Sequence, residues 1–248
     1  MSKVIIITGS SRGIGAATAC LAGEKGYSVC VNYFKNREAA ENVVSLIKAR
    51  GGHAISIAGD MSLESDVDRL FTAVDKELGT VSALVNNAGI IAPQTRVQDM
   101  DVTRMQRMFA VNIIGYFLCA REAIKRMSIR TGGKGGAIVN VSSAAARLGS
   151  PGEFVDYAAS KGAIDTMTLG LAKEIADEGI RVNAVRPGLI DTDIHAAAGA
   201  PDRAEKLRDS VPMKTVATSE DVAKAILWLL SDGASYSTGT IIDVAGGR

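Results

Sequence analysis

The sequence is poor in the residues that form disulfide frameworks, metal sites and aromatic clusters. Its 248 residues include 3 cysteines, 2 histidines, 5 prolines and 1 tryptophan, and aromatic side chains make up only 4%. The cysteines at positions 20, 30 and 119 are odd in number and lack C-x-x-C spacing, which argues against both a disulfide framework and a zinc site. We therefore expect no metal, and interpret the thiols as small core residues of a protein from a reducing compartment.

The sequence also has neither an excess of one charge nor a long apolar run. Lys and Arg number 28 against 27 Asp and Glu, a balance that offers little attraction to nucleic acid or to an anionic membrane. The first apolar run, Val4 to Ile7, is too short for a signal peptide. No run approaches the roughly 18 apolar residues of a membrane span. We expect a cytoplasmic protein with no nucleic-acid or membrane partner.

Short β-branched runs alternate with helical periods along the chain, and 47% of the residues are hydrophobic. Continuous apolar runs of this length are typical of a parallel sheet covered on both faces. The pattern predicts an α/β fold of the Rossmann type, with a doubly wound, seven-stranded parallel sheet and helices on both faces, in a single domain over 1–248. The expected strands are 4–7, 28–33, 53–57, 83–85, 137–141, 181–185 and 240–244. The expected helices are 14–25, 37–50, 64–77, 103–129, 155–178 and 219–231.

Residues 193–215 depart from this alternation. They contain an alanine-rich stretch that ends at Pro201, then a charged helical stretch, then Val211-Pro212-Met213. A long insertion after the end of a strand is where lids and substrate loops lie. We predict that 193–215 form a substrate lid, with a solvated surface helix as the alternative.

A glycine-rich turn follows the first expected strand. Glycines at 9, 13 and 15 let the backbone turn sharply and approach a pyrophosphate, while the next helix offers its N–H groups. The spacing G-x-x-x-G-x-G differs from the usual G-x-G-x-x-G, and glycines in such turns also occur for structural reasons. The position in the first strand–helix turn nevertheless indicates a dinucleotide site. The expected cofactor contacts in this turn are Gly9, Ser11, Arg12, Gly13, Ile14 and Gly15.

The end of the second expected strand bears on the choice of cofactor. An NAD site requires Asp or Glu about 20 residues after the glycines, but the strand ends in Asn32-Tyr33-Phe34-Lys35 without a carboxylate. Arg12, Lys35 and Arg37 offer cations that suit a 2′-phosphate, although all three are also explained as surface charges. We predict NADP(H) rather than NAD, with Asn32 and Tyr33 among its contacts.

Tyr157 and Lys161 form the strongest local pattern. Positions i and i+4 share one face of a helix, so the ammonium group can lie beside the phenol. Ser143 follows an expected strand, at the sheet edge where ligands bind. A phenol has an ordinary pKa of about 10, and a neighbouring positive charge favours the phenolate and lowers that pKa. These residues predict a Tyr–Lys–Ser site for proton transfer.

The combination of motifs resembles the short-chain dehydrogenase/reductase family over essentially the whole chain. Within that family the sequence is most similar to the branch of glucose dehydrogenases and 3-oxoacyl-carrier-protein reductases. The motifs that carry the resemblance are Thr8-Gly9…Gly13-x-Gly15, Asn86-Asn87-Ala88-Gly89, Asn112, Ser143, Tyr157…Lys161, Arg186-Pro187-Gly188-Leu189-Ile190-Asp191-Thr192, and Thr238-Gly239…Ala245-Gly246-Gly247.

The resemblance implies a role for each matching residue. Tyr157 becomes the general acid/base, Lys161 its activator and a ribose ligand, Ser143 the donor to the carbonyl oxygen, and Asn112 the holder of a proton-relay water. It also implies that the two long helices pair with symmetry mates, giving a homotetramer. The implied cofactor contacts are Asp60 at the adenine, Asn87 and Ala88 near the ribose, and Ile190 and Thr192 at the nicotinamide amide, accompanied by Met61, Gly89, Pro187 and Gly188.

We therefore expect an oxidoreductase that transfers hydride between NADP(H) and a small carbonyl compound, secondary alcohol or sugar. A 3-oxoacyl-carrier-protein reductase is the first alternative. Asp177 and Glu178 disfavour it, because many such reductases have a basic residue at the position of Glu178, although Lys134 partly offsets the charge. A sensor that binds NADP without turnover ranks lower, since it has no need of the complete proton-transfer set.

Overall fold

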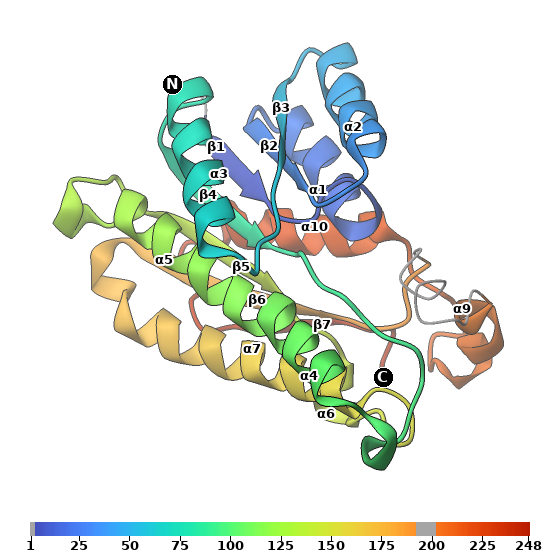
Figure 1. Ribbon diagram of the computed structural model, residues 1–248. Coiled ribbons are helices and arrows are strands. Elements are labelled where there is room, and N and C mark those ends of the chain that lie inside the picture. The colour runs from blue at the N-terminus through green and yellow to red at the C-terminus, as the bar shows by residue number, and fades with distance from the viewer. Residues whose placement is uncertain (1–2, 192–201) are drawn as a thin grey trace.

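The computed structural model describes residues 3–191 and 202–248 (Figure 1). Seven strands form one sheet in the order β3-β2-β1-β4-β5-β6-β7, and every ladder is parallel. This confirms the predicted fold class. The strands are β1 (Val4–Ile7), β2 (Ser28–Tyr33), β3 (His53–Ala58), β4 (Val81–Asn86), β5 (Gly136–Val141), β6 (Ile180–Pro187) and β7 (Ile241–Val244).

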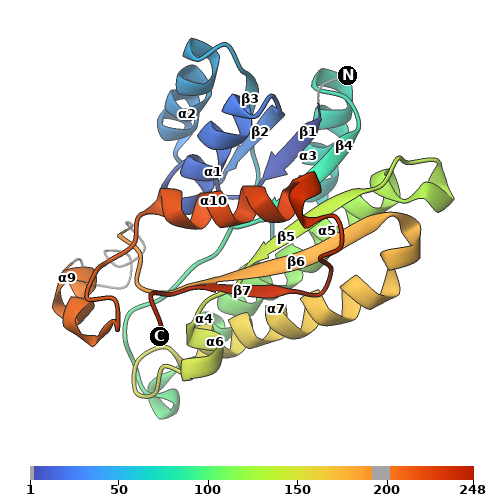
Figure 2. The ribbon, with the colours of Figure 1, turned by 180° about the vertical axis from the view of Figure 1, so that it is seen from behind.

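Helices cover both faces of the sheet. The helices are α1 (Gly13–Glu24), α2 (Arg37–Ala49), α3 (Glu64–Glu77), α4 (Val102–Phe109), α5 (Gly115–Met127), α6 (Ala145–Leu148), α7 (Val155–Glu174), α9 (Arg203–Leu207) and α10 (Ser219–Leu230). Figure 1 shows α3, α5 and α7 on the near face, and Figure 2 shows α1, α2 and α10 on the opposite one. Short 3-10 turns are η1 (Val97–Asp99), η3 (Ile129–Thr131), η4 (Ala176–Glu178), η5 (Arg208–Ser210) and η6 (Asp232–Ala234).

The sheet separates two apolar cores. Along β1, Ile5 and Ile7 pack into one core with α1, α2 and α10, whereas Val4 and Ile6 pack into the other with α3, α5 and α7. Because side chains alternate between faces, a strand covered on both sides is apolar at most of its positions. This burial explains the continuous apolar runs of the sequence. Among the residues described, no helix has the length and apolarity needed to cross a membrane.

The expected helix 103–129 is interrupted, which corrects the sequence-based assignment. α4 ends at Phe109, a π-helical turn η2 covers Ala110–Ile114, and α5 begins at Gly115. The cause is Asn112, whose side chain bonds to the loop after β4 instead of facing solvent. π-helical turns within helices frequently mark functional positions. The expected helix 155–178 is also shorter, because α7 ends at Glu174 and η4 follows.

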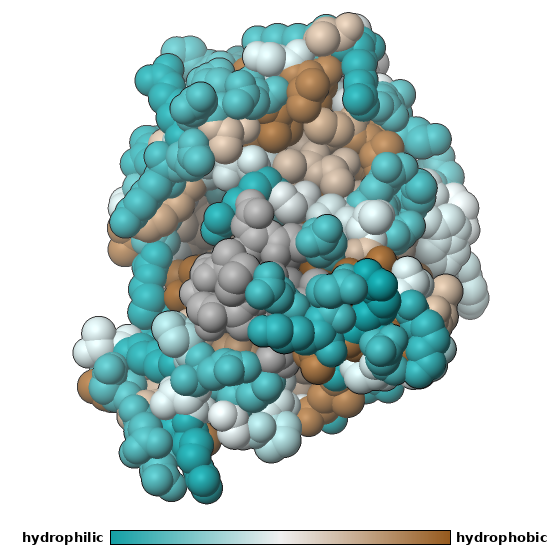
Figure 3. All heavy atoms as spheres, turned by 90° about the vertical axis from the view of Figure 1, so that its right-hand side faces the viewer, coloured by the Kyte–Doolittle hydropathy of each residue, from teal (hydrophilic) through white to brown (hydrophobic). Residues whose placement is uncertain are grey.

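The molecular surface on the side where α9 lies is mostly hydrophilic (Figure 3). Hydrophobic residues, drawn in brown, show in several places between the hydrophilic ones. Of the long insertion predicted at 193–215, only residues 202–215 are described. They form α9, η5 and a turn that leads on towards α10. Thr192 and 193–201 lie outside the described residues.

Candidate active site

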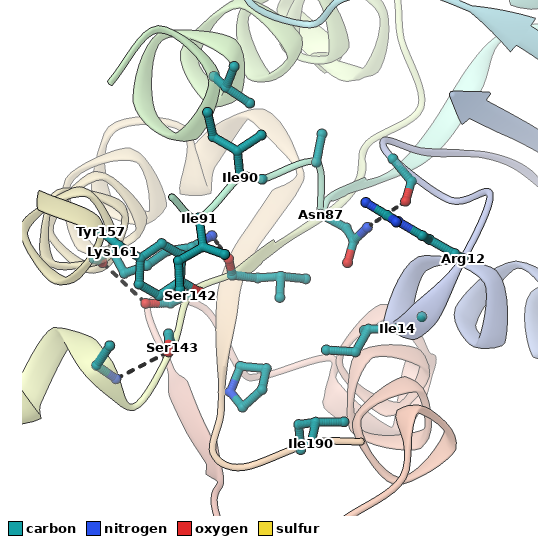
Figure 4. A pocket seen from close by; sticks show the side chains of 18 of the residues that line it. Arg12, Ile14, Asn87, Ile90, Ile91, Ser142, Ser143, Tyr157, Lys161 and Ile190 are labelled. Atoms are coloured by element: carbon teal, nitrogen blue, oxygen red, sulfur yellow. Dashed lines mark hydrogen bonds between the residues drawn. The ribbon is translucent and has the colours of Figure 1, made fainter. Parts of the chain in front are cut away.

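A cavity of about 600 Å³ lies at the carboxyl ends of the strands. Loops that follow β1 to β6 all contribute to its lining. In open parallel sheets, ligands bind at this edge, at the point where the connections from two adjacent strands lead to opposite sides of the sheet. Here that point lies between β1, which is followed by β2 on one side, and β4, which is followed by β5 on the other. Figure 4 shows Arg12 and Asn87 towards one end of the cavity, and Ser143, Tyr157 and Lys161 towards the other. We call these the glycine end and the tyrosine end.

Two backbone positions shape the glycine end. Gly9 has φ of 61°, and a Cβ there would lie 2.9 Å from the Cα of Ala88. At Gly15 a Cβ would lie 2.6 Å from Nδ2 of Asn87, so neither position accepts a side chain without movement. Gly15 therefore acts through packing, and Gly9 and Gly13 line the cavity directly.

Two asparagines hold this glycine turn in place. The backbone N–H of Gly9 donates to Oδ1 of Asn32 at 3.0 Å, and Nδ2 of Asn87 donates to the carbonyl oxygens of Thr8 and Gly9 at 2.9 and 3.1 Å. α1 begins directly after the turn, and within the described chain the side chain of Arg12 does not cap it. The first N–H groups of α1 therefore stay open to an anion beside the cavity. This cradle fits the pyrophosphate of a nicotinamide dinucleotide.

Asp60 and Arg107 form an ion pair at the glycine end, with their nitrogen and oxygen 2.9 Å apart. Burial alone would raise the pKa of Asp60, but hydrogen bonds from Ser62 and Arg107 outweigh that effect, so the pKa lies below its ordinary value. Arg107 and Lys35 also lie 5.7 and 5.1 Å from the ring centroid of Phe34. The result is a half-exposed aromatic ring between two cations, on the wall of the cavity.

Tyr33 does not line this wall, which corrects its assignment as a cofactor contact. Its side chain is 9% exposed and packs in the core cluster that includes Val43 and Val44 of α2. The strand alternates, so Asn32 turns towards the glycine turn while Tyr33 turns into the core. Phe34 takes the position at the cavity. Of the three predicted cations, Arg12 and Lys35 line the cavity, whereas Arg37 pairs with Glu41 on the surface at 3.6 Å.

At the tyrosine end, α7 brings Tyr157 and Lys161 to the cavity beside Ser143, which follows β5. The ammonium nitrogen of Lys161 donates to the carbonyl oxygen of Val141 at 2.7 Å and lies 5.8 Å from the ring centroid of Tyr157. Oγ of Ser143 accepts from the N–H of Ala145 at 3.1 Å, and the Ser143 hydroxyl also hydrogen-bonds with Tyr157.

The pKa values at this end differ from the expectation. Burial raises the pKa of Tyr157, and a hydrogen bond with Ser143 only partly lowers it. Burial also lowers the pKa of Lys161 to about 7, against the opposing charge of Asp165. We had expected Lys161 to lower the pKa of Tyr157. In the protein alone, desolvation of the buried phenol dominates instead, and burial disfavours the charged form of Lys161 as well.

Asn112 lies behind the cavity and not among the residues that line it. Its Oδ1 accepts from the N–H of Ile90 at 2.8 Å, and its Nδ2 donates to the carbonyl oxygen of Ile90 at 2.9 Å and to Oγ of Ser160 at 3.2 Å. The side chain is fully buried and thereby ties the loop after β4 to α7. These bonds occupy the side-chain amide of Asn112, so a relay water would have to bind to the backbone of this residue.

The structure brings most of the other predicted contacts to the cavity. The lining includes Ser11, Ile14, Asn32, Asp60, Met61, Asn87, Ala88, Gly89, Pro187, Gly188 and Ile190. It also includes residues that the sequence did not single out, among them Arg107, Ile90, Ile91, Phe154 and Leu207. Arg107 was not foreseen because its partner Asp60 is far away in sequence. Ser142 also lines the cavity, and its hydroxyl donates to the carbonyl oxygen of Lys161 at 3.1 Å.

Comparison with known proteins decides the family. A family model described as enoyl-(acyl carrier protein) reductase matches residues 9–248. The chain is 54% identical to an uncharacterized oxidoreductase, YgfF, of Escherichia coli strain K12, over 99% of each protein. The chain belongs to the short-chain dehydrogenase/reductase family. It is therefore an NAD(P)-dependent oxidoreductase that acts on a CH–OH or carbonyl group.

Two further similarities agree with this family. The chain is 41% identical to 3beta-hydroxysteroid dehydrogenase 1 of Eggerthella lenta, over 99% of this chain and 93% of that one. A crystal structure of a short-chain type dehydrogenase/reductase from Mycobacterium marinum has a TM-score of 0.92 at 31% identity, covering 99% of this chain and 94% of that one. The family resemblance read from the sequence is thereby confirmed.

Proposed function

We propose that this short-chain dehydrogenase/reductase transfers hydride between NADP(H) and the carbonyl carbon of a small ketone, aldehyde or sugar, with Tyr157 as general acid/base. One observation carries the proposal. The fold brings Ser143, Tyr157 and Lys161 to one end of a single cavity whose other end is a backbone cradle for phosphates. The bound nicotinamide supplies or accepts the hydride.

Each residue of the tyrosine end has a defined task in this proposal. In the reducing direction, Tyr157 gives its proton to the substrate oxygen. Ser143 donates a hydrogen bond to the same oxygen as negative charge develops there. Lys161 contacts the ribose and supplies positive charge near the phenol when it is protonated. The raised pKa of Tyr157 in the protein alone keeps the phenol protonated, which suits reduction.

The preference for NADP rests on the charges at the glycine end. Arg12 and Lys35 line the cavity, and Arg107 joins them from α4. Asp60 is a carboxylate at this end, but its negative charge is already paired with Arg107. A 2′-phosphate is a better partner for the remaining cations than a ribose hydroxyl.

The substrate proposal rests on the apolar lining of the tyrosine end. Ile90, Ile91, Leu148, Phe154 and Leu207 line the same cavity as Tyr157. Leu207 belongs to α9, which supports our proposal that the described part of the predicted lid, residues 202–215, lies over the substrate. We favour free carbonyl compounds whose apolar parts fill this space, with sugars as a less apolar possibility.

A 3-oxoacyl-carrier-protein reductase is the alternative, and the description of the matching family model favours a link to carrier proteins. The structure weakens one argument against it. Asp177 and Glu178 both pair with Arg130, at 2.5 and 3.3 Å, so they repel an acidic carrier protein less than two free carboxylates would. The comparison of kcat/KM for acetoacetyl-carrier protein and for the best free carbonyl substrate separates the two functions.

The same panel of substrates tests the proposal as a whole. NADPH absorbance is followed with small ketones, aldehydes and sugars, for the wild-type protein and for Tyr157→Phe. We expect consumption of NADPH that depends on substrate and on the Tyr157 hydroxyl. Tight binding of NADPH without turnover of any substrate would instead favour the sensor.

We also propose a homotetramer. Phe117 of α5 and Leu169 of α7 are half-exposed apolar residues on the helices expected to pair. Ala120 and Met167 of the same helices pack into the chain's own core. Light scattering at micromolar concentration tests the assembly, and the mass of a monomer would reject it.

A cytoplasmic location completes the proposal. Cys20, Cys30 and Cys119 are free thiols. Burial raises the pKa of Cys119 to about 12 and raises that of the other two as well, so the thiols stay protonated and unreactive. Such thiols fit a reducing compartment. Fractionation of the native cells, with detection of this chain, tests the location.

A further inference from the structure

The ammonium group of Lys161 has a second partner that the sequence did not indicate. Nζ of Lys161 donates to Oη of Tyr116 at 3.1 Å as well as to the carbonyl oxygen of Val141. The Tyr116 hydroxyl in turn donates to the same carbonyl oxygen at 3.0 Å. Tyr116 lies in the first turn of α5 and is only 2% exposed. The three groups form a closed triangle beneath the floor of the cavity.

This triangle sets the direction of the ammonium group. An ammonium has three N–H donors, and Val141 and Tyr116 take two of them. Lys161 lines the cavity, and its Nζ lies 3.7 Å from where a Cβ on Gly89 would be. The third N–H is therefore left for the cavity side, where the proposed ribose contact would form. Without the Tyr116 oxygen, the ammonium could rotate about its single remaining bond.

We propose that Tyr116 is a positioning residue, which acts through Lys161 by fixing its ammonium group so that one N–H faces the cavity beside Tyr157. The inference rests on the proposed function, because Lys161 matters only if it serves catalysis and cofactor binding. Tyr116 itself does not line the cavity that the structure describes, and so has no direct contact with a ligand there.

The charges around Lys161 show what the Tyr116 hydroxyl adds. The titratable groups that face Lys161 are Tyr157 and Asp165 on its own helix and Tyr116 on α5. Asp165 is held by Arg186 at 2.9 Å, which weakens its pull on the ammonium. The Tyr116 oxygen accepts a hydrogen bond from the charged form and therefore favours it. Tyr116 does not exchange its own proton near neutral pH, because burial raises its pKa well above the ordinary value.

The test is the pH dependence of kcat/KM for carbonyl reduction in the full-length protein. Reduction requires protonated Tyr157 and protonated Lys161. The pKa of Tyr157 is raised and that of Lys161 is about 7, so Lys161 loses its proton first and sets the alkaline limb. In Tyr116→Phe we expect this limb to move about one pH unit lower, since one hydrogen bond to the charged form is lost. The dissociation constant of NADPH, titrated without substrate, should follow the same shift.

Two controls make the result specific. Tyr27→Phe removes another buried phenol hydroxyl, in the core with α1 and away from the cavity, and should leave the limb in place. Tyr116→Met also removes the hydroxyl while filling the apolar space, and it should shift the alkaline limb as Tyr116→Phe does. It serves as the test if Tyr116→Phe folds poorly. Thermal unfolding of each variant measures any effect on stability alone.

A double-mutant cycle separates this inference from the proposed function. In the background of Lys161→Ala, Tyr116→Phe should change kcat/KM and NADPH affinity less than about twofold, because the group it acts through is gone. An unshifted limb in both Tyr116 variants, or an equal loss with and without Lys161, would overturn the inference. If Lys161→Ala and Tyr157→Phe themselves keep wild-type rates, the proposed function has failed instead.

Discussion

The glycine end of the cavity is built from backbone and from half-exposed side chains, whereas the tyrosine end is built from buried groups held by distant parts of the chain. Gly9 and Arg12 act within one short turn, so their neighbours in sequence determine their geometry. Lys161 depends on Tyr116 and Val141, which belong to other elements of the fold. We therefore expect changes at the glycine end to alter mainly binding, and changes at the tyrosine end to alter mainly the reaction.

Lys161→Ala should have the largest effect, and it should reduce both cofactor binding and the rate of the reaction. We expect kcat/KM to fall at least about a hundredfold, because proton transfer loses its supporting charge. NADPH affinity should fall as well, since the proposed ribose contact is lost. Steady-state kinetics and a fluorescence titration measure both. Lys173→Ala, an exposed lysine in the last turn of the same helix, is the matched control and should behave as wild type.

Gly9→Ala should damage binding before it affects the reaction. The new Cβ would lie 2.9 Å from the backbone of Ala88, at a residue whose φ of 61° already disfavours a side chain. We expect NADPH affinity to fall more than about tenfold, or about 1.4 kcal/mol. Gly26→Ala is the control. Gly26 also has a positive φ, of 82°, but a Cβ there would have no atom within 4 Å, so this variant has a similar backbone cost without a steric contact. Equal NADPH affinities of the two variants would contradict the claim that close packing of Gly9 against Ala88 is needed for cofactor binding.

Arg12→Ala should change the choice of cofactor. We expect the wild-type protein to bind NADPH at least about tenfold more tightly than NADH, which one charge-assisted contact to phosphate can supply. The variant should narrow that ratio with little change in NADH affinity. Arg37→Ala is the control, because Arg37 is paired with Glu41 outside the cavity. Equal affinities of the wild-type protein for both cofactors would contradict the proposed preference.

Arg107→Ala should have the smallest effect, on stability. The pKa of Asp60 is lowered in the folded state, so its pairing stabilises the fold above the unfolded pKa of about 3.9 and loses that contribution as pH falls through the folded value. We expect the variant to lose less than about 1 kcal/mol at pH 7, since Arg107 is partly exposed. Urea unfolding at pH 7 and pH 3 should show the loss shrinking in acid. Lys224→Ala, which breaks a surface pair with Glu220, is the comparison.

The sequence predicted the parts of the molecule that local pattern controls. Strands such as β1 are apolar at every position because both faces are covered, and the glycine turn is readable from its glycines and its position after the first strand. The π-helical turn at Asn112 was not predicted, since it depends on hydrogen bonds to Ile90. The end of β2 at Tyr33 was predicted, but which of Tyr33 and Phe34 faces the cavity depends on how the side chains alternate and on the loop that follows the strand.

The pKa values show the same limit at the tyrosine end. From sequence, Lys161 appears as a charge next to Tyr157, and the expected effect is a lowered phenol pKa. The structure adds burial of both groups, which raises the pKa of Tyr157 and lowers that of Lys161. Spacing along a helix tells which groups meet, but the dielectric around them is a property of the whole fold.

Tyr157→Phe tests the central claim most directly, because it removes one hydroxyl and leaves the ring that packs at the tyrosine end. NADPH affinity and the rate of carbonyl reduction are measured on the same preparation. We expect affinity within about twofold of wild type and a rate reduced by at least about a hundredfold, in line with the loss of a general acid. A variant that retains more than about a tenth of the wild-type rate would contradict proton transfer by Tyr157.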